Sequence, residues 1–174
     1  ATTSNKFIMN QQEILDRMRR LCSTREYCRR DILLKIESLI AKERKSAESS
    51  PNRGVGANSI KSPESISAED IINTLCEEKF IDDKRYATFF AKDKSSLQGW
   101  GENKIKYALQ NKGIEIDFIK FAIAQIDQDR STEKLKKVIA TKRDSLRGDP
   151  KAKEKLIRFL LSRGYTWQQF NDLI

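Results

Sequence analysis

Two neighbouring carboxylates, Asp82 and Asp83, are the residues of this chain whose type and spacing come nearest to a chemical centre. A pair of carboxylates can exchange a proton or form half of a magnesium site. The sequence places neither a third carboxylate at a telling spacing nor a phosphate-cradling loop beside them. We therefore interpret the pair as structural: one Asp caps a helix, and Arg85 and Tyr86 tie that helix to the next one.

The composition excludes most catalytic chemistry. The chain has 174 residues and no histidine, which is the usual general base and the commonest zinc ligand. Every Ser-His-Asp or Cys-His device is thereby excluded. The three cysteines, Cys22, Cys28 and Cys76, form no C-x-x-C pair, and we expect buried, unreactive thiols in a reducing cytosol. We predict no enzymatic activity, no metal site and no cofactor.

The basic residues are the stronger functional signal. Lys and Arg number 34 against 25 Asp and Glu, for a formal charge of +9. Residues 1–66 hold 13 basic and 8 acidic side chains, residues 67–129 hold 9 and 12, and residues 130–174 hold 12 and 5. Two basic ends around an acidic middle favour a surface that faces a polyanion, although a merely solvated helix face would give the same counts.

The candidate binding residues lie off the apolar stripes of their predicted helices, where they can pair with phosphates or with an acidic protein surface. They are Arg17, Arg20, Arg29 and Arg30 near the start of the chain, and Lys134, Lys137, Lys142, Arg143, Lys151, Lys155 and Arg158 near its end. The sequence does not choose between these two kinds of partner.

These residues must be positioned by helices. Apolar side chains recur at helical spacing along most of the chain, no segment reads as a strand, and nine helices are predicted. Ser23 with Glu26, Ser67, Ser131 or Thr132, and Thr166 are expected to begin helices. No apolar run approaches the roughly 18 residues of a membrane helix, and the N-terminus lacks a secretory layout, so we expect a cytoplasmic protein without membrane contact.

An internal repeat groups the helices. A shift of 51 residues superposes a unit of helix, basic residue, glycine, apolar residue and helix, in which Lys112-Gly113 matches Arg163-Gly164. The same shift places Trp167 on Ile116, so we expect Trp167 in the core rather than stacked on a base; Trp100 stays undecided. Self-similarity of this kind predicts stacked helical units that share faces.

We therefore predict an all-α fold, an elongated array of three tandem three-helix units in a monomer. The expected ranges are 8–44 for the first unit, 45–66 for a flexible linker rich in Ser, Asn, Gly and Pro, 67–114 for the second unit and 115–174 for the basic third unit.

Read in this way, the chain resembles the RecX family of bacterial regulators of the RecA recombinase. The resemblance rests on the run from Phe80 to Ala87 with its D-D-x-R-Y-A order, on Gly99, on Lys112-Gly113-Ile114 and on the closing run from Phe159 to Tyr165. The residues carried over as a structural signature are Asp82, Asp83, Arg85, Tyr86, Gly99, Gly113 and Gly164.

The resemblance implies a regulator that binds RecA nucleoprotein filaments, limits their growth, and inhibits recombinase and ATPase activity in DNA repair. Such a protein needs no active site, in agreement with the missing histidine. The alternative is a sequence-independent DNA-binding module, with single- or double-stranded DNA as its partner, which would show a steep salt dependence.

The structural interpretation of the carboxylate pair is testable. We expect Asp83→Ala to lower the free energy of unfolding by about 1 kcal/mol, as for a lost helix cap. Thermal melting and an activity assay on the same samples check this, and a loss of activity with unchanged melting would contradict it.

Overall fold

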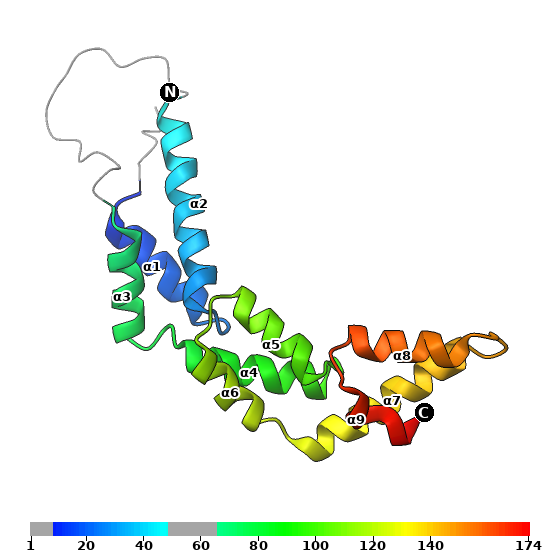
Figure 1. The fold of residues 1–174 in the computed structure, drawn as a ribbon. Coiled ribbons are helices and arrows are strands. Elements are labelled where there is room, and N and C mark those ends of the chain that lie inside the picture. The colour runs from blue at the N-terminus through cyan, green and yellow to red at the C-terminus, as the bar shows by residue number, and fades with distance from the viewer. Residues whose placement is uncertain (1–8, 49–65) are drawn as a thin grey trace, which may run out of the picture. The chain divides into compact units, whose positions relative to one another are not determined.

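The computed structural model describes residues 9–48 and 66–174, and in these ranges it contains α-helices and no strand. The all-α prediction is confirmed. Within these ranges, no helix is at once long and apolar enough to span a membrane. The helices are α1 (Gln11–Cys22), α2 (Arg29–Glu48), α3 (Ala68–Glu77), α4 (Asp83–Ser96), α5 (Glu102–Asn111), α6 (Ile116–Ala124), α7 (Gln128–Ser145), α8 (Ala152–Ser162) and α9 (Trp167–Phe170), with a final 3-10 turn (Asn171–Leu173) (Figure 1).

Local capping residues explain several of the helix starts. Asn10 and Glu13 form a capping box on α1, in which each side chain accepts a hydrogen bond from the other residue's backbone N–H. Ser67 caps α3 and Thr166 caps α9, as the sequence predicts. The predicted box at Ser23 is wrong, because its hydroxyl instead donates to the carbonyl of Arg19 and ends α1.

The start predicted for the seventh helix is also wrong. It was expected at Ser131 or Thr132, but α7 begins at Gln128 behind the N-cap Asp127. The Asp127 side chain accepts the backbone N–H of Arg130 at 3.0 Å, which satisfies one of the free donors of the first turn.

The chain divides into two compact units, residues 1–82 and 83–174. In the first unit α1, α2 and α3 share one core around Ile14, Ile32, Ile36, Ile71 and Leu75, all at most 1% exposed. Each fully buried side chain of this size contributes about 1.5–3 kcal/mol to folding.

Two arginines tie α3 to the other helices of this unit. The Arg19 Nε donates to Glu78 at 2.8 Å, and a second nitrogen of the same guanidinium also reaches that carboxylate. This hydrogen bonding lowers the pKa of Glu78. Arg29 of α2 binds Glu69 and Asn73 of α3, each at 3.0 Å. Glu69 at the start of α3 and Glu78 directly after its end are therefore each matched by an arginine of α2 or α1.

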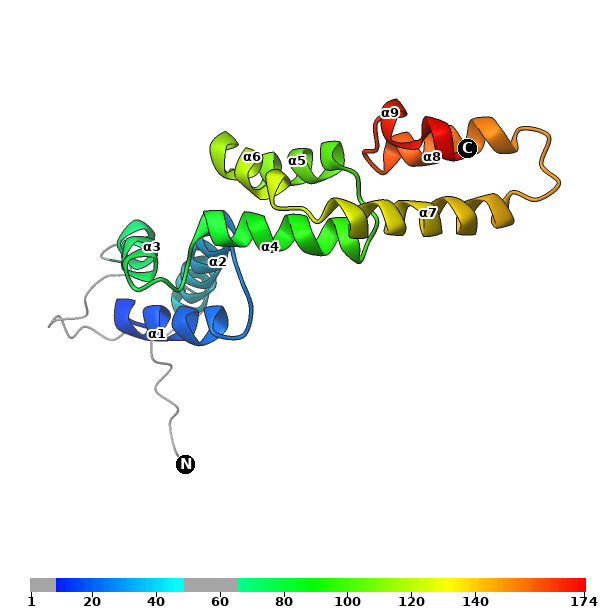
Figure 2. The same ribbon diagram turned by 90° about the horizontal axis from the view of Figure 1, so that it is seen from below.

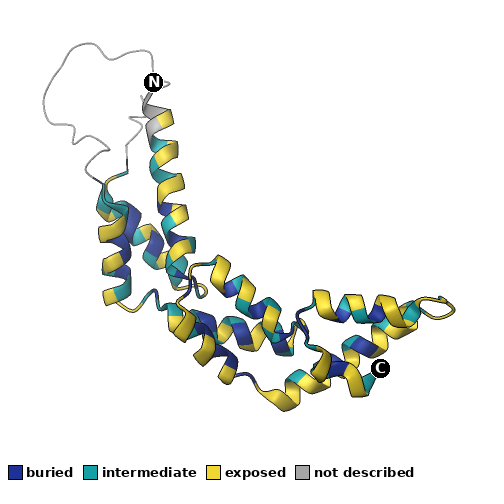
Figure 3. Ribbon diagram, in the orientation of Figure 1, coloured by how far each residue is buried: buried dark blue, intermediate teal, exposed yellow. Residues whose placement is uncertain are grey.

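The second unit contains two groups of three helices. Figure 2 shows α5 and α6 together beside α4, and α8 and α9 together beside α7. Every helix of the two groups contains buried residues (Figure 3). Ala87 and Ala91 let α4 approach its neighbours closely, while Leu135, Leu160 and Phe170 fill the core of the last group.

The internal repeat predicted from the sequence corresponds to α5–α6 and α8–α9. Ile105, Leu109, Ile114 and Ile119 are buried, and so are their counterparts Leu156, Leu160, Tyr165 and Phe170. The expectation for Trp167 is wrong: it is 46% exposed, as its counterpart Ile116 is at 51%. Its ring lies edge-on to Phe170 at 5.4 Å between centroids, on the outside of the group.

The grouping of the helices differs from the expected ranges. α3, expected to open the second unit at residue 67, lies in the first core, and α6, expected in the third unit, packs against α4 and α5. α2 also continues to Glu48, past the expected start of the linker at 45; residues 49–65 lie outside the described ranges. The expected boundaries fail because each core is complete only when a third helix covers the apolar faces of the other two, and α3 and α6 are these third helices.

The two groups of the second unit meet where backbone touches backbone. A Cβ on Gly101 would lie 2.3 Å from the carbonyl carbon of Gly164, and a Cβ on Gly164 would lie 2.3 Å from the backbone nitrogen of Lys104. The Gly101 N–H donates to the carbonyl of Arg163 at 2.8 Å, and the Asn103 N–H donates to that of Gly164 at 3.2 Å. Only glycine permits this approach.

This junction predicts a matched pair of variants. In Gly164→Ala the new Cβ would clash with Lys104, and alanine would also be strained at the left-handed φ of +85°. We therefore expect the free energy of unfolding of the second unit to fall by roughly 2–4 kcal/mol. Gly148 has a similar φ of +83° but nothing within 4 Å, so Gly148→Ala should cost only roughly 1–2 kcal/mol. Urea denaturation measures both, and equal losses would contradict the importance of the close approach.

Candidate anion-binding site

α7 and α8 line an open hollow of about 240 Å³, and among the described residues its lining has four cations and no carboxylate. We call it the α7–α8 hollow. Three of its cations, Lys134, Lys137 and Lys142, come from α7, and the fourth, Arg163, ends α8. The rest of the lining consists of Val138, Thr141, Ser145 and Phe159. A concave surface with this charge concentrates anions from solution.

The fold holds two of these cations in place. The Arg163 guanidinium donates to the backbone carbonyls of Gln98, at 2.6 Å, and Gly99, at 3.1 Å, in the loop between α4 and α5. It also lies 5.0 Å from the centre of the Phe159 ring, and the Lys142 ammonium lies 5.2 Å from that ring. Such cation–π contacts stabilise a positive charge without neutralising it.

The three lysines keep their charge available. Within the described ranges, none of Lys134, Lys137 and Lys142 lies within 4.0 Å of a carboxylate. Glu133 binds Lys136 at 2.9 Å, and this hydrogen bond is the main reason that its pKa falls, with a smaller contribution from the charge of Lys137. The hollow can therefore bind a phosphate or carboxylate without first breaking an ion pair.

The structure does not bring the other predicted residues of this part of the chain into the hollow. Lys155 is paired with Asp149, and Arg158 lies 3.3 Å from Glu154. Arg143 donates to the carbonyl of Leu173 at 3.1 Å, facing the final 3-10 turn. Lys151 precedes α8, and its backbone N–H donates to Asp149.

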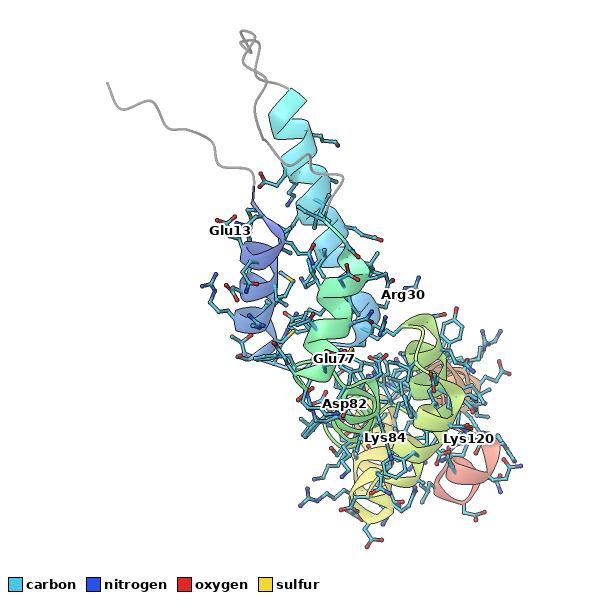
Figure 4. The ribbon with its side chains drawn as sticks, turned by 90° about the vertical axis from the view of Figure 1, so that its left-hand side faces the viewer. Glu13, Arg30, Glu77, Asp82, Lys84 and Lys120 are labelled. Atoms are coloured by element: carbon cyan, nitrogen blue, oxygen red, sulfur yellow. The ribbon has the colours of Figure 1, made fainter. Side chains whose placement is uncertain are left out.

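The predicted residues of the first unit lie in three different environments. Arg17 and Arg20 line a groove between α1 and α2. Arg29 is occupied by Glu69 and Asn73, so it acts in packing. Arg30 is exposed at the start of α2 (Figure 4).

The signature carboxylates lie at the start of α4. Asp82 directly precedes the helix and so holds the N-cap position, whereas Asp83, which the Asp83→Ala prediction treats as the cap, belongs to the first turn with Arg85 and Tyr86. The Lys112 ammonium, at the end of α5, lies 5.6 Å from the Tyr86 ring centre. The described residues contain no group of three His, Cys, Asp or Glu side chains suited to a metal ion.

The signature glycines occupy turns rather than a ligand site. Gly99, Gly113 and Gly164 all have positive φ, and Gly113 and Gly164 end α5 and α8 in the same way. Gly99 also lets the α4–α5 loop lie against α7, because a Cβ there would come within 2.7 Å of Val138.

Sequence reasoning missed two residues that shape the hollow, Arg163 and Phe159. The signal for Arg163 was present, because the repeat matches it to Lys112 as the last residue before a glycine. Phe159 carried no signal of its own, since an aromatic residue on an amphipathic helix normally indicates core.

Comparisons with known protein sequences point to one family. A profile described as "RecX, second three-helix domain" matches residues 82–123, which cover α4, α5 and α6 up to its last residue but one. Regulatory protein RecX of Clostridium tetani (strain Massachusetts / E88) is 30% identical over 151 residues, covering 84% of this chain and 65% of the relative. Regulatory protein RecX of Clostridium botulinum (strain Eklund 17B / Type B) is 39% identical over 107 residues, covering 59% and 50%. The chain spans half to about two thirds of the length of these relatives.

Solved structures share the fold. A crystal structure of regulatory protein RecX aligns with a TM-score of 0.70 and 20% identity, over 92% of this chain and 70% of the other. The crystal structure of RecX from Lactobacillus salivarius aligns with a TM-score of 0.64 and 18% identity, over 92% of both chains. At these identities the alignments establish the helical fold alone.

The pairing of Lys155 with Asp149 predicts a pH effect on stability. The hydrogen bond from Lys155, helped by the Lys151 N–H, lowers the pKa of Asp149 below its ordinary 3.8. A depressed folded-state pKa gives stability that is present above the unfolded pKa and lost as pH falls through the folded one. We expect Asp149→Asn to destabilise the protein at neutral pH, with a difference that shrinks below pH 3.8. Urea titrations across pH measure this, and a pH-independent difference would contradict it.

Proposed function

Because this chain belongs to the RecX family, we propose that it is a regulator of RecA that binds RecA nucleoprotein filaments and limits their growth. Inhibition of recombinase and ATPase activity follows from that binding. The observation that carries the proposal at residue level is the α7–α8 hollow, where three lysines that have no carboxylate partner among the described residues lie beside a fixed arginine. A nucleoprotein filament offers both phosphates and acidic protein surface to such a site.

Binding of this kind needs no catalytic group. The chain carries several three-helix groups on one backbone, so contacts that are individually weak add to one another through high effective concentration. A chain bound at the growing end of a filament occupies surface that the next RecA protomer would need. The bound chain then blocks addition of RecA at that end. ATP hydrolysis falls because less filament is formed.

Direct binding to DNA is the second candidate, because the four cations of the hollow can bind the phosphates of free DNA as well as those of a filament. Lysines that contact phosphates release counterions, so the affinity would fall steeply with salt. Each phosphate contact contributes about −0.7 to the log-log salt slope on single strands and about −0.9 on duplex DNA. An acidic protein surface would give a shallower dependence.

The test is a triple charge reversal, Lys134→Glu, Lys137→Glu and Lys142→Glu. We expect it to weaken binding to RecA filaments on single-stranded DNA by about tenfold to a hundredfold, because three attractive contacts become repulsive. Inhibition of ATP hydrolysis by RecA should shift to correspondingly higher protein concentration. Fluorescence anisotropy on filaments and on the free oligonucleotide separates filament binding from binding to DNA alone.

The matched control reverses three exposed cations outside the hollow: Lys120→Glu, Arg130→Glu and Arg147→Glu. It changes the net charge equally, so it should retain most of the filament affinity if position matters. If both triple variants lost the same filament affinity, binding would depend on the net charge of the protein and not on the α7–α8 hollow. Unchanged ATP hydrolysis and filament length at saturating wild-type protein would overturn the proposed function.

A further inference from the structure

A second concave surface lies in the other unit, between α1 and α2. It is a groove of about 810 Å³. Its lining combines the cations Arg17, Arg20, Arg25, Lys35 and Lys42 with apolar surface that includes Leu34. We call it the α1–α2 groove.

The groove has an excess of positive charge. Five of its lining residues are cations and one, Asp31, is a carboxylate. Within the described ranges, none of the five cations forms an ion pair with a carboxylate. The two arginines that this unit uses for packing, Arg19 and Arg29, do not line the groove. The charge is thus available to an acidic ligand.

The apolar part of the groove suits side chains of a protein better than bases of a nucleic acid. Leu34 is 54% exposed on α2, next to the partly buried Leu21 and Leu39. The one aromatic residue of the lining, Tyr27, is only 6% exposed, and the Arg25 guanidinium lies 4.5 Å from its ring centre. Base binding relies on accessible aromatic faces, whereas an aliphatic floor accepts apolar side chains.

The chain's own remaining segments do not match this charge. Residues 1–8 and 49–65 contain Lys6, Arg53 and Lys61 against a single acid, Glu64. Their net charge has the same sign as that of the groove. The positive charge of the groove is instead complemented by an acidic partner.

We propose that the α1–α2 groove is a docking site for an acidic segment of a partner protein, one that places apolar side chains on Leu34 while its carboxylates meet the surrounding cations. This site goes beyond the proposed function, because it lies in a different unit from the α7–α8 hollow and does not depend on it. A mixed apolar and charged site of this kind recognises an amphipathic segment.

The probe is a fluorescein-labelled peptide of Glu and Leu arranged as an amphipathic helix, with two relatives in which Leu is replaced by Ala or Glu by Gln. We expect saturable anisotropy with the Glu and Leu peptide and at least roughly tenfold weaker binding of both relatives, since each lacks one half of the recognition. Leu34→Asp and Lys35→Glu, both on the exposed side of α2, should each weaken binding by a similar factor.

The controls match these variants in chemistry and exposure. Leu161→Asp changes a leucine that is 50% exposed on α8, and Lys120→Glu changes an exposed lysine on α6 (Figure 4). Both should bind the peptide as wild type does, and circular dichroism should give all four variants near-native melting. Absence of saturable binding, equal losses in the controls, or displacement of the peptide by oligo(dT) with the same sensitivity to Leu34→Asp would each overturn the proposal. None of these outcomes bears on filament binding through the α7–α8 hollow.

Discussion

The second unit depends on one contact, the approach of the Gly101 backbone to that of Gly164. Because neither residue has a Cβ, the start of α5 can lie against the turn after α8, where two backbone hydrogen bonds join the groups. The same turn fixes Arg163, whose guanidinium reaches the carbonyls of the α4–α5 loop. The constraint that joins the groups thereby sets the wall of the α7–α8 hollow, so packing and candidate function share the same residues.

Much of this architecture follows from local pattern. The 51-residue repeat identified α5–α6 and α8–α9 correctly, because buried apolar positions and a glycine after a basic residue are set within each helix pair. The grouping did not follow, because whether α3 closes one core or opens the next depends on contacts distant in sequence. The acidic middle segment was a result of the wrong boundaries. Residues 1–82 hold 14 basic and 13 acidic side chains, residues 83–126 hold 8 and 5, and residues 127–174 hold 12 and 7. The charge instead becomes more positive from group to group.

The sequence predicts which cations of the candidate site are neutralised only where the partner carboxylate lies three or four residues away on the same helix. Glu154 and Arg158 are four residues apart, and Glu133 and Lys136 three apart, so their pairing on one helix face could be read from the sequence. Arg143 and Arg163 bind backbone carbonyls 30 and 65 residues away. Only the folded chain separates such anchored cations from the lysines that are left to face a partner.

The central proposal is that the α7–α8 hollow is the surface by which this chain binds a RecA filament. A cryo-electron microscopy reconstruction of the chain bound to RecA filaments on single-stranded DNA tests it most directly. We expect Lys134, Lys137 and Lys142 to lie within hydrogen-bonding distance of phosphates or carboxylates of the filament. A bound chain whose α7–α8 hollow faces solvent would contradict it.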